Sequence, residues 1–143
     1  MGSTMIRLYV DESELRDVLA RLAGRVSDLE PAMRRVAGHL ADAVEEQFAS
    51  EGRPRWPPLA PSTIRQRARK GKWPGRILQV TGRLAASITT RSGAREAAVG
   101  TAVEYGVYHQ LGTRRIPARP FLRLPPEHLR EIIDELRRFL ASR

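Results

Sequence analysis

The stretch from residue 52 to residue 76 limits most strongly how this chain can fold. It reads GRPRWPPLAPSTIRQRARKGKWPGR and holds half of the chain's ten prolines. Proline lacks a backbone N–H and fixes φ, so the proline-rich part cannot enter a helix interior or a central strand. We therefore expect a long loop excursion from the core. One short helix is expected within it, from Ile64 to Lys70, with Ser62 or Thr63 as its cap.

A short strand and a first helix are predicted near the start of the chain. Residues 6–10 alternate between apolar side chains and Arg or Tyr, which is the period of two of a strand. Asp11 is the expected N-cap of the following helix, because Glu14 stands at capping-box spacing from it. Gly24 is expected to end that helix.

Two longer apolar stripes predict the main helices. The stripe within residues 33–48 predicts the longest helix, with Ser27 or Asp28 as its cap. The stripe within residues 129–140 predicts a C-terminal helix opened by Pro125 and Pro126, since proline costs little at the first positions of a helix. This second stripe can face the core or a partner helix, and the core is the preferred interpretation.

A small antiparallel sheet is predicted between these helices. Residues 84–90 are expected to form a strand, entered by a helical turn after a turn at residues 81–82. A hairpin turn at residues 92–93 leads to a returning strand at residues 96–101, and residues 115–117 are a candidate edge strand. The expected class is therefore α+β, with a small antiparallel sheet packed against a long helix and a C-terminal helix.

Length and spacing predict a single α+β domain over residues 5–143, with residues 52–76 as an extended basic arm. Residues 1–4 read as a cloning remnant, with Met5 as the native start. The formal charge of +9 and the pI of about 11.2 favour an anionic partner, either a nucleic acid or an acidic protein surface. No apolar run approaches the roughly 20 residues of a membrane span, so no membrane contact is expected.

The sequence carries none of the common catalytic or cofactor patterns, and we expect no enzyme. Without cysteine there are no disulfides, thiol nucleophiles or cysteine-based zinc sites. The three histidines are far apart, and neither a nucleophile elbow nor a phosphate loop occurs. We therefore predict no catalytic residue, no cofactor and no metal ligand. His109 is a candidate general base without a visible partner, and a structural hydrogen bond is the preferred role.

Arginine and aromatic residues gather in two segments, 52–76 and 105–122. Arg and Trp are frequent at the energetic centres of protein interfaces. The arginines can instead line a phosphate path or remain solvated, and the tryptophans can simply pin the loop to the body. The predicted protein-interface residues are Arg53, Arg55, Trp56, Arg65, Arg67, Arg69, Trp73, His109, Gln110, Arg114, Arg115, Arg119 and Phe121.

Several short motifs follow one another between residues 30 and 125. They are W-P-P-L at 56–59, T-G-R-L-x-x-S at 81–87, H-Q-x-G at 109–112 and P-A-R-P-F-L at 117–122. In this order they resemble the phage virion morphogenesis (tail completion) family of Mu-like and P2-like tailed phages. The first and last helices match by placement alone.

The resemblance implies a non-enzymatic structural protein of a tailed phage or prophage, which completes the tail or the head–tail junction. It implies a ring component of the virion, assembled in the host cytoplasm, with copies of itself and neighbouring tail or neck proteins as partners. The charge leaves a different class open, a basic nucleic-acid-binding domain of a mobile element. A ring whose basic loops contact DNA non-specifically would combine the two.

Overall fold

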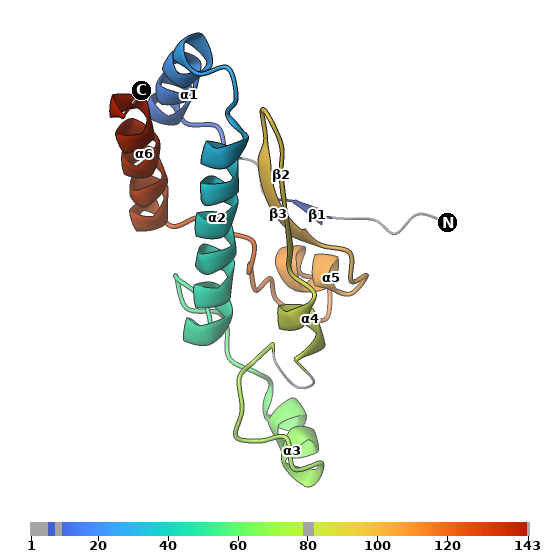
Figure 1. Ribbon diagram of the computed structural model, residues 1–143. Helices are drawn as coiled ribbons and strands as arrows, with labels where there is room; N and C mark the ends of the chain where they lie inside the picture. The colour runs from blue at the N-terminus through green and yellow to red at the C-terminus, as the bar shows by residue number, and fades with distance from the viewer. Residues whose placement is uncertain (1–5, 8–9, 79–81, 143) are drawn as a thin grey trace.

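The computed structural model describes residues 6–7, 10–78 and 82–142. The predicted remnant at residues 1–4, the middle of the predicted first strand at residues 8–9, and Thr81 lie outside the described residues. The described elements, shown in Figure 1, are β1 (Ile6–Arg7), α1 (Ser13–Arg25), α2 (Glu30–Ser50), α3 (Pro61–Arg69), α4 (Arg83–Ala86), β2 (Thr89–Ser92), β3 (Ala97–Thr101), α5 (Gly106–Leu111) and α6 (Pro126–Ala141).

Helix α2 forms the centre of the molecule, with α1 and α6 on one side and the sheet on the other (Figure 1). It buries one face, including Leu40, Val44 and Phe48, because apolar residues return every three or four positions. It is the longest of the described helices, as predicted, and the α+β class is confirmed. Helix α6 packs on α2 and α1. Helix α2 therefore lies between α6 and the sheet.

The apolar stripe of α6 faces the core, as predicted. Ile132, Ile133 and Leu136 are almost fully buried within it. Burying one such side chain contributes roughly 1.5–3 kcal/mol, so this stripe is a principal source of stability for the helical side. None of the described helices combines the length and apolarity that crossing a membrane would take.

The sheet has the order β1-β3-β2, and both pairings are antiparallel. The strand predicted at residues 84–90 is wrong in its first half, because α4 occupies that part and β2 begins at Thr89. The expected helical turn at this entry is confirmed. Leu84 is buried through that turn, and the Ser87 hydroxyl donates to the Leu84 carbonyl at 2.6 Å, closing it.

The edge strand predicted at residues 115–117 is also wrong. Thr113 N–H donates to the Ile116 carbonyl at 2.8 Å, which closes a turn instead. The Thr113 hydroxyl accepts hydrogen bonds from the backbone N–H groups of Arg115 and Ile116, both at 3.2 Å. These local bonds use the N–H groups that a strand ladder would need.

The N-cap of the first helix lies one residue later than predicted. Glu12 is the N-cap, and its carboxylate accepts from the N–H groups of Glu14 at 3.0 Å and Leu15 at 2.8 Å. Asp11 is therefore not the cap, because the longer Glu12 side chain reaches both donors. Gly24 lies inside the helix, which continues to Arg25.

The predicted caps of the next two helices are both wrong. Leu29 is the N-cap of α2, although Asp28, one residue earlier, accepts a hydrogen bond from Glu30 N–H at 3.1 Å. Helix α3 begins at Pro61, so Ser62 and Thr63 lie inside its first turn and do not cap it. Proline is favoured at the first helical position, since its missing N–H would have no partner there.

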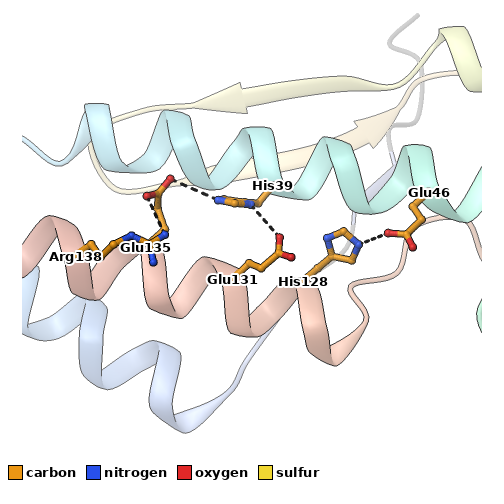
Figure 2. A network of polar contacts seen from close by, with 6 residues as sticks. All are labelled: His39, Glu46, His128, Glu131, Glu135 and Arg138. Atoms are coloured by element: carbon orange, nitrogen blue, oxygen red, sulfur yellow. Dashed lines mark hydrogen bonds and ion pairs between the residues drawn. The ribbon is translucent and has the colours of Figure 1, made fainter.

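Polar side chains of α2 and α6 contact one another where the two helices pack together, as Figure 2 shows. His39 of α2 stands between Glu131 and Glu135 of α6, with nitrogen–oxygen distances of 3.7 and 3.5 Å. His128 of α6 contacts Glu46 of α2, with 2.5 Å between Nε2 and Oε2. Within the described ranges, no group of three or more His, Cys, Asp or Glu side chains is arranged to hold a metal ion.

Candidate protein interface at the basic arm

The basic arm, residues 52–76, leaves the body at the C-terminal end of α2 and carries α3 beyond it (Figure 1). Two residues with positive φ turn the chain there, Glu51 at 60° and Gly52 at 97°. A Cβ on Gly52 would stand 2.4 Å from the Trp56 ring. Glycine is therefore required both for the backbone angle and for the close approach of the tryptophan.

Trp56 fixes the start of the arm to the core. Its side chain is only 4% exposed, and its indole N–H donates to the Pro120 carbonyl at 2.9 Å. Its ring meets Phe48 edge-on at 6.1 Å, and Phe48 in turn packs against Phe121 at 5.3 Å. The predicted alternative, that a tryptophan pins the loop to the body, describes Trp56 well.

Arg119 holds the arm from the other side. Its guanidinium donates from Nε to the Pro57 carbonyl and from Nη2 to the Pro58 carbonyl, both at 2.9 Å. Its backbone N–H donates to the His109 carbonyl at 2.6 Å. The side chain is 5% exposed, so an arginine of the second basic segment is used to clamp the first.

Gln110 of α5 holds the segment that carries Arg119. Its amide oxygen accepts from the N–H groups of Phe121 at 3.1 Å and Leu122 at 2.9 Å. Its amide nitrogen donates to the Leu122 carbonyl at 3.0 Å. The side chain thus acts as a substitute strand partner for two buried residues.

The predicted interface residues therefore divide into three groups. Trp56, Gln110, Arg119 and Phe121 contact other parts of the same chain and join the arm to the body. Arg67, Trp73 and His109 are half-buried. The exposed members are Arg53, Arg55, Arg65, Arg69, Arg114 and Arg115. Of these, Arg53 also pairs with Glu46 of α2 at 2.8 Å. That any of them meets a partner stays a prediction.

Two exposed apolar residues of α5 were missed in the sequence. Tyr108 is 54% exposed and Leu111 is 72% exposed. They stand three positions apart and precede Arg114 and Arg115, so they form a small apolar patch beside exposed cations. Their spacing is visible in the sequence. Which side of α5 faces solvent is not, because it follows from the hydrogen bonds of Gln110 to residues 121 and 122.

His109 lies in a positively charged setting. Burial first, and then the charges of Arg119 and Arg67, lower the pKa of its imidazole. Its ring meets Tyr105 edge-on at 5.9 Å, and its buried Nδ1 has no hydrogen-bond partner among the described residues. The hydrogen bonds of His109 use its backbone: its carbonyl accepts from Arg119 N–H at 2.6 Å, and its N–H donates to the Tyr105 carbonyl at 3.4 Å.

Comparison with known proteins identifies the family to which the sequence is similar. The sequence profile of the phage virion morphogenesis family matches residues 10–141, almost the whole chain. The chain belongs to this family. The match includes all four motifs of the resemblance, which is thereby confirmed. The structure shows that Trp56, Gln110, Arg119 and Phe121 of these motifs make the contacts that hold the arm.

Three relatives are similar over most of their length. Two are Mu-like prophage FluMu G proteins of Haemophilus influenzae: G protein 2, 36% identical over 92% of this chain and 94% of the relative, and G protein 1, 38% identical over 96% of each. The third is the putative capsid assembly protein G of Escherichia phage Mu, 32% identical over 76% of this chain and 78% of the relative. No solved structure matches the chain significantly. Family and relatives indicate a phage or prophage protein of virion morphogenesis with an assembly role.

Proposed function

We propose that this protein is a non-enzymatic structural component that completes the tail or the head–tail junction of a phage or prophage virion, where it works as part of a ring. The observation that carries the proposal is the arm. Helix α3 stands away from the body with Arg65 and Arg69 exposed, while Trp56 and Arg119 hold its base.

An arm held in this way suits contact with a neighbouring subunit. Because its base is fixed before binding, docking costs less conformational entropy than ordering a free loop would. The exposed arginines steer an acidic partner surface into register. The patch of Tyr108 and Leu111 offers apolar area at a second point on the surface, as a subunit with two neighbours requires.

Nucleic-acid binding is the second candidate, and the absence of acids from residues 52–76 favours it. Phosphate contacts by these cations would release counterions, so the logarithm of the affinity would fall linearly with the logarithm of salt concentration. Assembly predicts self-association that survives salt and ignores a DNA duplex. Light-scattering mass at low and high salt, with and without a duplex, separates the two.

The test of the assembly role is deletion of the gene in the phage or prophage that encodes it. We expect electron micrographs of the lysate to show heads and tails that are not joined, with joined particles restored by the wild-type gene in trans. A double variant, Arg65→Glu with Arg69→Glu, should fail to restore them. Its matched control is Arg21→Glu with Arg25→Glu, which makes the same charge change on exposed residues of α1. Normal numbers of complete particles without the gene would overturn the proposal.

A further inference from the structure

A cavity of about 360 Å³ lies where the arm meets the body. Arg67 of α3 lines one side, Arg83 of α4 another, and Tyr105 and His109 at α5 a third. On α3, Arg67 is half-buried while Arg65 and Arg69 are exposed, so the helix turns one of its arginines inward. This cavity is separate from the outer surface of the arm that the proposed ring contact uses.

Arg67 and His109 line this cavity, and neither they nor the neighbouring Arg119 have a carboxylate partner among the described residues. Arg67 donates from Nη1 to the Arg76 carbonyl at 3.3 Å, and Arg119 donates to the carbonyls described above. Among the described residues, no ion pair joins Arg67, Arg119 or His109 to a carboxylate. Removing positive charge from water without a counter-charge is costly. An anion from outside the chain would offset that cost.

The pKa values of Arg67, Arg119 and His109 are all lowered. Burial lowers the pKa of Arg67, and burial together with the charge of Arg67 lowers the pKa of Arg119. The pKa of His109 is lowered by burial and by both arginines. Burial therefore disfavours the charged form of all three groups, and neighbouring positive charge adds to this effect at Arg119 and His109.

The sequence explains why the chain does not supply the anion itself. Between Glu51 and Glu96 there is no Asp or Glu, whereas eleven Lys and Arg residues occur in that interval. Glu51 comes near this region, but its carboxylate accepts a hydrogen bond from Ile77 N–H at 2.8 Å. Positive charge therefore outweighs negative charge at the arm and its base.

The other described residues that line the cavity are apolar. Ile77, Leu78 and Leu84 are buried beside it, and the Arg83 guanidinium lies 5.7 Å from the centre of the Tyr105 ring. A site with apolar walls and arginine donors suits a flexible carboxylate side chain that has apolar neighbours. A DNA duplex is a stiff rod whose phosphates lie on its outside, so it meets the exposed arginines of α3 more readily than a cavity behind them.

We propose that this cavity binds a glutamate or aspartate side chain, together with an adjacent apolar residue, from a segment of a neighbouring virion protein. Arg67 supplies guanidinium N–H donors to the carboxylate. The ring of His109 lines the cavity beside this donor. The inference rests on the proposed function for the identity of the neighbour.

The test uses the isolated full chain and two blocked tripeptides as probes, acetyl-Leu-Glu-Phe-amide and acetyl-Leu-Gln-Phe-amide. Binding is followed by the NMR signals of the His109 ring. We expect the Glu peptide to shift these signals and the Gln peptide to bind about tenfold more weakly, because a charge-assisted hydrogen bond is lost. Equal binding of the two peptides, or no shift with either, would overturn the proposal.

A matched pair of variants locates the effect. Arg67→Gln should weaken binding of the Glu peptide about tenfold, whereas Arg65→Gln, on the exposed side of the same helix, should leave it within about twofold. The peptide pair on the wild-type chain tests the site even if a variant unfolds. A His109 shift caused by inorganic phosphate or a DNA duplex, but not by the Glu peptide, would mark a phosphate site and overturn the proposal. Because no virion is involved, failure here is distinct from failure of the gene-deletion test.

Discussion

Arg119 gives two proline carbonyls a partner that regular structure does not provide. Pro57 and Pro58 stand in a stretch that forms neither helix nor strand, and the buried guanidinium binds both of their carbonyl oxygens. Arg115, four positions earlier, is exposed. The two arginines are alike in the sequence and differ in what the fold places around them.

Replacement of Arg119 by Met is expected to lower the free energy of unfolding by about 3 kcal/mol, since the carbonyls of Pro57 and Pro58 lose two charged hydrogen-bond donors that come from a buried side chain. Arg115→Met should change it by less than about 0.5 kcal/mol. Urea unfolding followed by circular dichroism measures both. Equal, small losses would show that the clamp does not stabilise the arm.

The contact between Glu46 and His128 should make the stability of the protein depend on pH in the acidic range. The hydrogen bond from His128, and then the charge of Arg53, lower the pKa of Glu46 below its ordinary value of 4.5. A carboxyl with a depressed folded-state pKa stabilises the protein above its unfolded-state value, and this stabilisation is lost as the pH falls through the folded-state value. We expect the free energy of unfolding to fall as the pH drops below 4.5.

Glu46→Gln should flatten that dependence, because the variant has no carboxyl to protonate at this position. Glu45→Gln, at the exposed neighbouring position, should retain it. Urea unfolding at several pH values between neutral and about pH 3 covers the range in which carboxyl groups titrate. A slope that is the same in both variants would contradict the assignment to Glu46.

The helices with one buried face could be predicted from the sequence more reliably than the other elements. Helices α2 and α6 repeat apolar residues with the period of a helix because each packs one side against its neighbours. Helix α4 was harder to separate from a strand. Leu84 and Ile88 fit an alternating pattern, and a single turn of helix also buries Leu84.

The candidate site shows a similar limit. Trp56 and Arg119 could be selected for their chemistry, but the bonds they make join positions more than sixty residues apart. Their role as clamps therefore requires the fold. Arg67 could not be distinguished from Arg65 and Arg69, because the sequence does not tell which side of a short polar helix faces the body.

The exposed side of α5 leads to a prediction about assembly. Leu111→Ser removes an exposed apolar side chain, so the free energy of unfolding should change by less than about 0.5 kcal/mol. If the patch docks on a neighbour, the same variant should restore few joined particles to a deletion lysate. Electron microscopy counts them, and Arg91→Ser, also exposed, serves as the control. Full restoration by Leu111→Ser would remove α5 from the interface.

The whole molecule separates its charges by region. The sixteen Asp and Glu residues lie outside the interval from residue 52 to residue 95, whereas the arm and its base are strongly basic. Outside that interval, fourteen Lys and Arg residues nearly balance the sixteen acids, so the protein offers a basic projection on a body of mixed charge. That division suits subunits that dock side by side, and it makes the arm the first place to look for a neighbour.

The central claim is that this protein is a structural part of the virion at the tail or the head–tail junction. The most direct measurement is quantitative mass spectrometry of purified virions and of separated heads and tails. We predict that the chain is present in complete virions and in the tail or junction fraction, at a constant ratio to the other structural proteins. Its absence from purified virions, with the chain recovered free or on DNA in the lysate, would contradict the account.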